Sequence, residues 1–370
     1  MTKKLHIICF NIPSPPDYGG VIDIYYKLEA LANEGTEIHL HCFEYDRPRA
    51  ADLSRFCKEI YYYPRKTGFK AQLSTLPYIV RSRKHPKLLR NLSALPAPIL
   101  FEGLHTCFLL GHPLLAACNK LVRAHNIEHQ YYYHLSSAES NLVKRVYYLI
   151  ESIRLSFFER KLALANHILA ISTSEEHYFQ QTFKKAKFIP AFHPYQKVSS
   201  KTGKGDYLLF HGNLSVSENQ NAVKFLMREV FTQITISFVI AGKNPPEWLI
   251  SMANDIPHVM LVANPSTEQM NTLIREAHVC LIPTFQTTGV KLKLLASLFC
   301  GRHCLTNSMM VKGTGLKNLC HIADTAEDMV RTIRNLMEIE FDSNEIEKRK
   351  VQLATSYSNE ANARKIMELI

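Results

Sequence analysis

The sequence predicts an α/β protein built from two parallel-sheet units. Short apolar runs alternate with amphipathic helical segments twice, over residues 1–195 and again over 206–345. The polar, glycine-containing stretch between them, residues 196–205, is expected to be a linker. A chain of 370 residues also exceeds the usual size of one hydrophobic core. The last segment, 346–370, is predicted to be helical. In one of its two candidate positions this helix packs back on the first domain.

The first unit is expected to alternate strand, loop, helix and strand. LHIICFN is predicted to be a buried strand, and IPSPPDYGG a loop, because its prolines and glycines cannot continue a helix. VIDIYYKLEALANEG has helical apolar spacing and ends at a glycine. Further strands are predicted in order along the chain at EIHLHCF, KEIYYYP, PILFE, KLVRAHN and HILAIS.

The second unit repeats this alternation. Helices are expected at ENQNAVKFLMREVF, at STEQMNTLIREA with Ser266 as N-cap, after GVKLK, and from Thr325. Strands are expected at YLLFHGN, ISFVIAGKN, HVMLVAN, VCLIPTF, HCLTNS and CHIAD. Strands separated by helices predict parallel sheets with right-handed crossovers.

Composition and charge narrow the class of protein. The net charge of +11 suits an acidic partner such as a nucleotide diphosphate, a lipid pyrophosphate or an anionic membrane. No nucleic-acid-binding module is evident, so nucleic acid is not expected as a partner. Nine cysteines scattered through apolar segments are typical of reduced cytosolic proteins. No apolar run reaches the ~18 residues that span a bilayer, and the expected location is cytoplasmic.

Ligands of open parallel sheets bind beyond the carboxyl ends of the strands, so the residues there are candidates. His125 directly follows an apolar strand, where an imidazole can donate to a reacting oxygen; its alternative is a hydrogen-bonded loop residue. Gly19 and Gly20 allow close backbone approach to a ligand or simply form a tight turn. The other strand-end candidates are Asn126, Glu128, Gly212, Asn213 and Lys243. G-x-G-x-x-G and P-loop motifs are absent, and no metal site is expected.

The segment PTFQTTGVKLKLLASLFCG, residues 283–301, joins a strand end, a small-residue turn and a helix that opens with two lysines. A helix N-terminus with nearby ammonium groups is suited to a diphosphate. Lys291 and Lys293 are two residues apart, so both cannot point the same way from a helix. We therefore expect at most one of them in the site.

Four segments make the chain resemble glycosyltransferases of the GT-B fold, similar to retaining glycosyltransferase family 4. They are PSPPDYGGVIDIYYKLEALANEG, RAHNIEHQYY, FHGNLSVSENQNAVKFL and PTFQTTGVKLKLLASLFCG. The resemblance implies two Rossmann-like domains facing each other across a cleft. It also implies metal-independent, cofactor-free transfer of a hexose, with retention, from a UDP- or GDP-sugar to a surface-glycan or lipid-linked acceptor.

The resemblance also implies residue roles. His125 would lie near the reacting sugar, and Gly19, Gly20, Asn126 and Glu128 would line the acceptor side. The donor would bind the second domain at Gly212, Asn213, Lys243, Thr288, Gly289, Val290, Lys291 and Lys293.

The chain departs from the family at the donor motif. The family commonly carries two glutamates here, and their positions hold Thr288 and Ala296; the second glutamate normally binds the ribose hydroxyls. The basic residues expected after the first strand of the second domain are replaced by Glu218 and Asn219. Donor binding is then rebuilt, weakened or lost. A binding or scaffold homologue in glycan assembly, and a phosphosugar epimerase, are the competing interpretations.

Two basic segments are candidates for contact with an anionic membrane. The amphipathic helix predicted over 142–164 places cations among aromatics, and we expect its apolar side to pack on the core with the other side solvated. YIVRSRKHPKLLR clusters cations without clear periodicity, which makes it the better membrane or acceptor candidate; its alternative is a solvated loop. Peripheral association with the inner face of the cell membrane follows from either.

Overall fold

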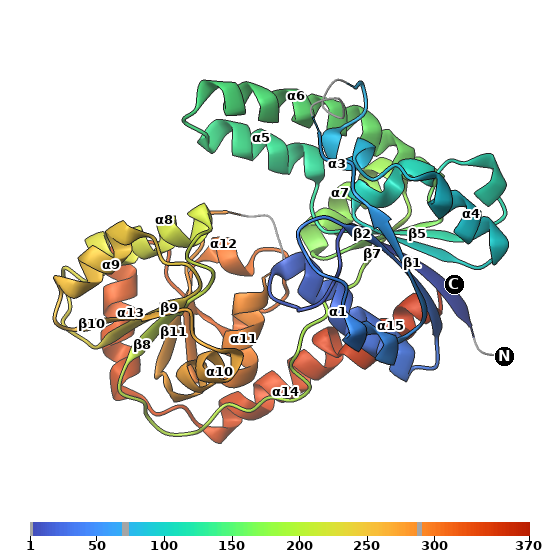
Figure 1. The fold of residues 1–370 in the computed structure, drawn as a ribbon. Helices are drawn as coiled ribbons and strands as arrows, with labels where there is room; N and C mark the ends of the chain where they lie inside the picture. Colours follow the sequence, from blue (N-terminus) through green and yellow to red (C-terminus); the bar gives the residue numbers. More distant parts are fainter. Residues whose placement is uncertain (1–2, 69–73, 287–290) are drawn as a thin grey trace. The chain divides into compact units, whose positions relative to one another are not determined.

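The computed structural model describes residues 3–68, 74–286 and 291–370, which divide into two compact units. The first unit comprises the chain up to Pro194 together with Tyr357–Ile370, and the second comprises the remaining described residues from Tyr195 to Ser356. Each unit is a parallel sheet with helices against it (Figure 1). The predicted fold class of two parallel-sheet α/β domains is confirmed.

In the first unit, the described strands pair in the order β3-β2-β1-β4-β5-β6-β7, all parallel. The strands are β1 (Lys4–Cys9), β2 (Glu37–Glu44), β3 (Cys57–Pro64), β4 (Ile99–Glu102), β5 (Lys120–Ala124), β6 (His167–Ala170) and β7 (Ala186–Phe188). The helices are α1 (Gly19–Asn33), α3 (Tyr78–Arg81), α4 (Pro86–Ala94), α5 (Glu128–Ala138), α6 (Leu142–Glu159), α7 (Thr173–Phe183) and α15 (Asn359–Met367).

The strand order of this sheet reverses between β1 and β4. From β1 the chain moves outward to β2 and β3, then returns to β4 on the other side of β1. At such a point the loops on either side diverge and leave room for a ligand beyond the carboxyl ends. Glu102 ends β4, and His125 follows the last residue of the adjacent β5.

Helix α15 completes the hydrophobic core on one side of the first sheet. Ala363 and Ile366 are fully buried in the same cluster as Leu28 and Leu31 of α1. The two helices lie side by side (Figure 1). The N-terminal strand is tied to the same region, because the Lys3 ammonium donates to the Met367 carbonyl at 2.6 Å. Residues Tyr357–Ile370 are therefore an integral part of the first unit, whereas residues 346–356 belong to the second.

In the second unit, the described strands pair in the order β10-β9-β8-β11-β12-β13, again all parallel, with the reversal between β8 and β11. The strands are β8 (Leu208–His211), β9 (Phe238–Gly242), β10 (Val259–Ala263), β11 (Val279–Leu281), β12 (His303–Thr306) and β13 (His321–Ile322). The helices are α8 (Ser217–Phe225), α9 (Glu247–Asn254), α10 (Thr267–Glu276), α11 (Leu292–Cys300), α12 (Ser308–Val311), α13 (Ala326–Glu338) and α14 (Ser343–Tyr357).

Residues 196–205, predicted to be a linker, lie against the second unit. Gly203 exchanges backbone hydrogen bonds with Phe341. Gly205 has no room for a side chain, because a Cβ there would lie 2.4 Å from the Glu276 carbonyl oxygen. Gly205 therefore allows close backbone packing, whereas Gly203 has a φ of +80°, which favours glycine.

The two basic segments differ in where their apolar side chains lie. In YIVRSRKHPKLLR, the apolar side chains Ile79, Val80 and Leu88 are buried in the core, and Arg83 donates from within it to the Phe10 carbonyl at 2.8 Å. In α6, by contrast, much of the apolar side is exposed. The expectation that α6 packs its apolar side on the core is wrong for that set of residues, because a neighbouring helix covers a different side.

We predict that Ile366→Ala destabilises the first unit by about 2–5 kcal/mol, because it opens a cavity between α15 and α1. The measurement is chemical denaturation followed by circular dichroism. Val351→Ala in α14 is the control, since that side chain is 68% exposed and contributes little to any core. Equal unfolding free energies for the two variants would show that α15 does not contribute to this core.

Candidate functional site

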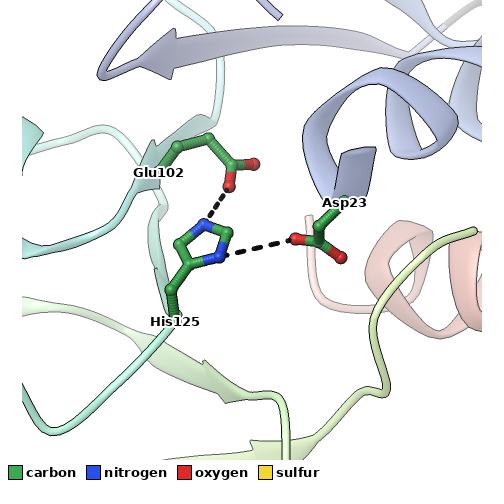
Figure 2. A group of neighbouring side chains, drawn as sticks. All are labelled: Asp23, Glu102 and His125. Carbon is green, nitrogen blue, oxygen red and sulfur yellow. Dashed lines mark hydrogen bonds and ion pairs between the residues drawn. The ribbon is translucent and has the colours of Figure 1, made fainter. Parts of the chain in front are cut away.

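The first candidate site is a cluster of buried polar side chains at the strand-order reversal of the N-terminal sheet. His125 lies between two carboxylates (Figure 2). Its Nε2 is 3.1 Å from Glu102 Oε2, and its Nδ1 is 3.9 Å from Asp23 Oδ2. Glu102 comes from the end of β4, and Asp23 comes from the first turns of α1. His125 is 6% exposed, and among the described residues its Nδ1 has no hydrogen-bond partner.

Two buried cations hold these carboxylates in place. Lys27 donates to Asp23 Oδ2 at 2.9 Å and to Glu102 Oε1 at 2.7 Å, so it joins α1 to β4. Arg123 from β5 binds both oxygens of Asp23, at 2.9 and 3.1 Å. Its remaining donors reach the carbonyls of Ile189 and Pro190. Four fully buried charges therefore form a network of two acids and two bases.

The charge balance of this network fixes the protonation of its acids. Burial alone would raise the pKa of Asp23, but Arg123 and Lys27 hold the pKa of that carboxyl well below its usual range. The pKa of Glu102 is also lowered, because Lys27 and the hydrogen bond from His125 outweigh the opposing effect of burial. Both groups are therefore carboxylates near neutral pH.

Asp23, Glu102 and His125 have the ligand types and mutual distances of a metal site, with donor atoms within 4.8 Å of one another. The chemistry of the surroundings argues against a resident cation. The Lys27 ammonium already bonds to both carboxylates, and Arg123 occupies both oxygens of Asp23. A divalent ion would add two charges to a network that is balanced without it. The residues fit an ion-paired scaffold for His125 better than a metal centre.

Aromatic groups and glycines shape the space around His125. The Phe10 ring, just after β1, packs edge-on against the imidazole with centroids 5.6 Å apart. Gly20 lies under that ring, and a Cβ at Gly20 would be 2.8 Å from Phe10 Cζ. Gly103 has a φ of +71°, and a Cβ at this position would clash with the His105 side chain. Gly20 therefore meets a side chain of its own unit, and Gly19 begins α1 beside it.

Asn126 and Glu128 follow His125 but do not share its network. Glu128, in the first turn of α5, is 4% exposed and borders a small enclosed cavity with Leu104 and Phe179. Burial raises the pKa of Glu128 to about 8, although a hydrogen bond from Asn126 acts to lower it. Glu128 is therefore mostly protonated at neutral pH, so it suits a donor role and not that of a general base.

The second candidate site lies at the strand-order reversal of the C-terminal sheet, around Lys293 in the first turn of α11. Its ammonium donates to Asn219 Oδ1 at 2.6 Å and lies 4.0 Å from Glu218 Oε1. It also lies over the Phe210 ring, 5.6 Å from the centroid. Burial lowers the pKa of Lys293 to about 8, an effect that Glu218 opposes and the Lys291 cation reinforces.

The loops around Lys293 are tightly packed. Asn219 also donates to the Asn213 carbonyl at 2.8 Å, which ties the β8 loop to α8 and α11. A Cβ at Gly242, the end of β9, would lie 1.8 Å from the Gly212 carbonyl oxygen, so only glycine fits. Lys243 follows and is exposed. Glu218 and Asn219 lie in the first turn of α8.

Of the remaining predicted donor residues, Lys291 is the N-cap of α11 and its ammonium turns back to the Gln286 carbonyl at 3.0 Å. Thr288, Gly289 and Val290 lie outside the described residues. Ala296 is buried in α11, a helix without an acidic side chain. Lys291 and Lys293 thus point to different partners.

Sequence reasoning missed Asp23, Lys27 and Arg123, and it placed Glu102 as the last residue of the predicted strand PILFE. Signals for them were present. Asp23 and Lys27 are spaced i,i+4 on the predicted first helix, and Arg123 interrupts an apolar strand. A charge within a strand that is buried on both faces requires a partner. Which residue would supply that partner depends on the tertiary fold.

No protein-family model matches the chain. In sequence, it is 27% identical over 330 residues to an uncharacterised 44.6 kDa protein in the cps region of Klebsiella pneumoniae, covering 84% of each chain.

Solved structures give a clear match along the whole chain. WaaG, a glycosyltransferase involved in lipopolysaccharide biosynthesis, has a TM-score of 0.64 at 12% identity, covering 99% of each chain. The fold is GT-B. Anabaena Alr3699/HepE, solved with UDP and glucose, has a TM-score of 0.60 at 10% identity, covering 100% of this chain and 99% of its own. A variant of S. aureus TarM, solved with Fondaparinux, alpha-GlcNAc-glycerol and UDP, has a TM-score of 0.62 at 9% identity, with coverage of 100% and 99%.

These structures share the GT-B fold with the chain at low sequence identity, so the likeness establishes architecture. Among the described residues, no helix is long and apolar enough to cross a bilayer.

We predict that UDP affinity falls as pH rises through about 8, by up to about tenfold per pH unit, if Lys293 binds the diphosphate. The ammonium form binds an anion, and this form is lost above its pKa. The measurement is isothermal titration calorimetry with UDP from about pH 7 to about pH 9.

Lys293→Met should weaken UDP binding and remove this pH dependence, whereas Lys312→Met, at an exposed lysine of the same unit, should preserve both. A wild-type affinity that is constant across this range would remove Lys293 from the diphosphate site.

Proposed function

We propose that the protein is a glycosyltransferase that moves a hexose from a nucleotide diphosphate sugar to a surface-glycan or lipid-linked acceptor. The observation that carries this proposal is His125, held by Glu102 at the strand-order reversal of the N-terminal sheet of a GT-B fold. Open sheets bind ligands at this position, and the buried ion network gives the ring a fixed orientation.

In this proposal the first unit handles the acceptor and the reacting sugar. Nε2 of His125 is engaged by Glu102, whereas Nδ1 makes no hydrogen bond with any residue that the structure describes. Nδ1 is therefore the ring atom that we assign to a hydroxyl of the hexose or of the acceptor. Asp23, Lys27 and Arg123 act through their hold on Glu102 and His125, and they are positioning residues.

The second unit takes the nucleotide diphosphate sugar, with UDP or GDP as the nucleotide. The first N–H groups of α11 have no partner within the helix, and Lys293 adds a cation beside them. A diphosphate there would restore the full charge of the Lys293 ammonium and replace its contact with Asn219. Gly212, Asn213 and Lys243 border the same sheet edge, with Thr288, Gly289, Val290 and Lys291 next to the helix start in sequence.

The proposed reaction retains the configuration of the sugar and uses no metal. The bond from the anomeric carbon to the diphosphate oxygen breaks, and the acceptor oxygen bonds to the same face of that carbon. The acceptor proton passes to the departing diphosphate. The α11 amides and Lys293 would stabilise the negative charge that develops on the leaving group, which is the largest contribution a protein can make here.

The acceptor class is supported by the neighbours. WaaG is described as a glycosyltransferase of lipopolysaccharide biosynthesis, and the TarM structure contains alpha-GlcNAc-glycerol. A lipid-linked acceptor would bring a cytoplasmic enzyme to the inner face of the cell membrane.

A second candidate function rests on α11, which contains no acid; Ala296 occupies the position where the resembled family binds the ribose. A homologue without donor binding would act as a scaffold in glycan assembly. The two functions are separated by thermal unfolding in the presence of UDP, GDP and their hexose conjugates. An increase in melting temperature with any one of them supports the transferase, and no increase with any of them supports the scaffold.

For the transferase, we predict that His125→Ala lowers kcat by about 10²-fold or more while leaving nucleotide affinity nearly unchanged. The nucleotide site is assigned to the other unit, so the ring contributes to turnover and not to nucleotide binding. Turnover is measured as UDP or GDP release with the sugar nucleotide that stabilises the protein. His134→Ala, at an exposed histidine of α5, is the control and should retain full activity. A His125→Ala variant that is folded and fully active would exclude the ring from the site.

A further inference from the structure

The outer side of α6 carries a row of exposed apolar side chains, which we call the α6 stripe: Val143, Val146, Ile150, Ile153 and Phe157. Their spacing of three and four residues places them on one side of the helix. Val143 is 80% exposed and Phe157 is 61% exposed. Leu142 and Leu149 extend the same apolar surface. Scattered exposed apolar residues are ordinary, but a continuous row of this length marks an interaction surface.

The fold of the first unit does not require the α6 stripe. The opposite side of α6 is buried by Leu155 and Phe158, which belong to the main core. Ser152 donates to the His129 carbonyl at 2.7 Å, and α5 lies alongside α6 as the other arm of a hairpin (Figure 1). The helix is therefore held by one set of residues and presents another set outward.

The exposed charged side chains of α6 and its C-cap are of one sign. Lys144 and Arg145 are exposed between the apolar residues, and the Arg160 guanidinium lies over the Phe157 ring, 5.2 Å from its centroid. The acids of α6 are Glu151 and Glu159, and both are buried with partners in the core. The exposed side of this helix is thus apolar and cationic with no exposed carboxylate.

We propose that the α6 stripe is a membrane-docking surface, which lies in the interface of an anionic bilayer with its apolar side chains among the acyl chains and its cations on the lipid phosphates. An amphipathic helix with cations and aromatic residues beside its apolar face binds membranes in this way. Cations near the surface add attraction to anionic lipids. This deepens the proposed function by naming the surface through which the enzyme meets a lipid-linked acceptor.

Charge complementarity favours a bilayer over a second copy of this chain. The 3-4 spacing of the α6 stripe would suit pairing with an identical helix. Such a pair would bring Arg154, Arg160 and Lys161 close to the same cations of its partner, and α6 has no exposed acid to compensate them. An anionic lipid surface supplies the opposite charge along the whole helix.

The test is co-sedimentation of the full-length protein with vesicles of phosphatidylcholine alone and of equimolar phosphatidylcholine and phosphatidylglycerol. We expect binding to the anionic vesicles only. The double variant Ile150→Ser/Ile153→Ser should bind about tenfold more weakly or worse. Lys144→Gln/Arg145→Gln should lose roughly fivefold per cation, a loss that added salt reproduces in the wild type.

The matched control is Ile250→Ser/Val351→Ser, which changes two exposed apolar residues of the second unit and should bind like the wild type. All the substituted side chains are exposed, and circular dichroism confirms that each variant is folded. Equal binding by the α6 and control variants, or no binding by the wild type, overturns the proposal. A wild-type dimer in sedimentation velocity that Ile150→Ser/Ile153→Ser dissociates also overturns it in favour of self-association.

The outcome is separable from the test of function. The increase in melting temperature with a sugar nucleotide depends on the second unit, so it should persist in the α6 variants. Vesicle binding without any nucleotide effect would retain the membrane surface and reject the transferase. A nucleotide effect without vesicle binding would do the reverse.

Discussion

The first unit depends on a buried network of opposite charges. Moving Asp23, Glu102, Lys27 and Arg123 out of water is unfavourable, and the cost is offset only because each charge has a partner of opposite sign within hydrogen-bonding distance. Loss of one member would leave an uncompensated buried charge, so the four residues form a single unit. These contacts fix the positions of α1, β4 and β5 relative to one another. They thereby also fix the position of His125, which follows β5.

The two units use their corresponding strand-order reversals in different ways. The N-terminal cluster is closed, with neutralised charges and one histidine nitrogen that makes no hydrogen bond with the described residues. The C-terminal cluster contains Lys293, and burial lowers the pKa of its ammonium. That ammonium donates mainly to the neutral side chain of Asn219. His211 beside it hydrogen-bonds Ser297, and burial lowers its pKa to about 3, so it adds no second cation. An anion would therefore stabilise the second cluster far more than the first.

The sequence predicts the strands well because parallel strands are buried on both faces and are almost entirely apolar, as in LHIICF. It does not predict β7, which has three residues including an exposed lysine, or α5, whose EHQYYYHL lacks a helical apolar period. The strand-end residues of the candidate sites can be found from the chain alone, since parallel topology gathers them. The partners of His125 cannot, because they come from separate elements. Nor can periodicity tell which side of α6 is covered, since that depends on where α5 packs.

The position of α15 constrains the order in which the protein can be made. Every strand of the first sheet belongs to the first 188 residues, yet Ile366 fills the core beneath α1. A ribosome must therefore synthesise the whole second unit before the first can bury that apolar surface. Until α15 is synthesised, part of the apolar core of the first unit remains exposed to solvent. The second unit, in contrast, has every strand of its sheet once residue 322 is synthesised.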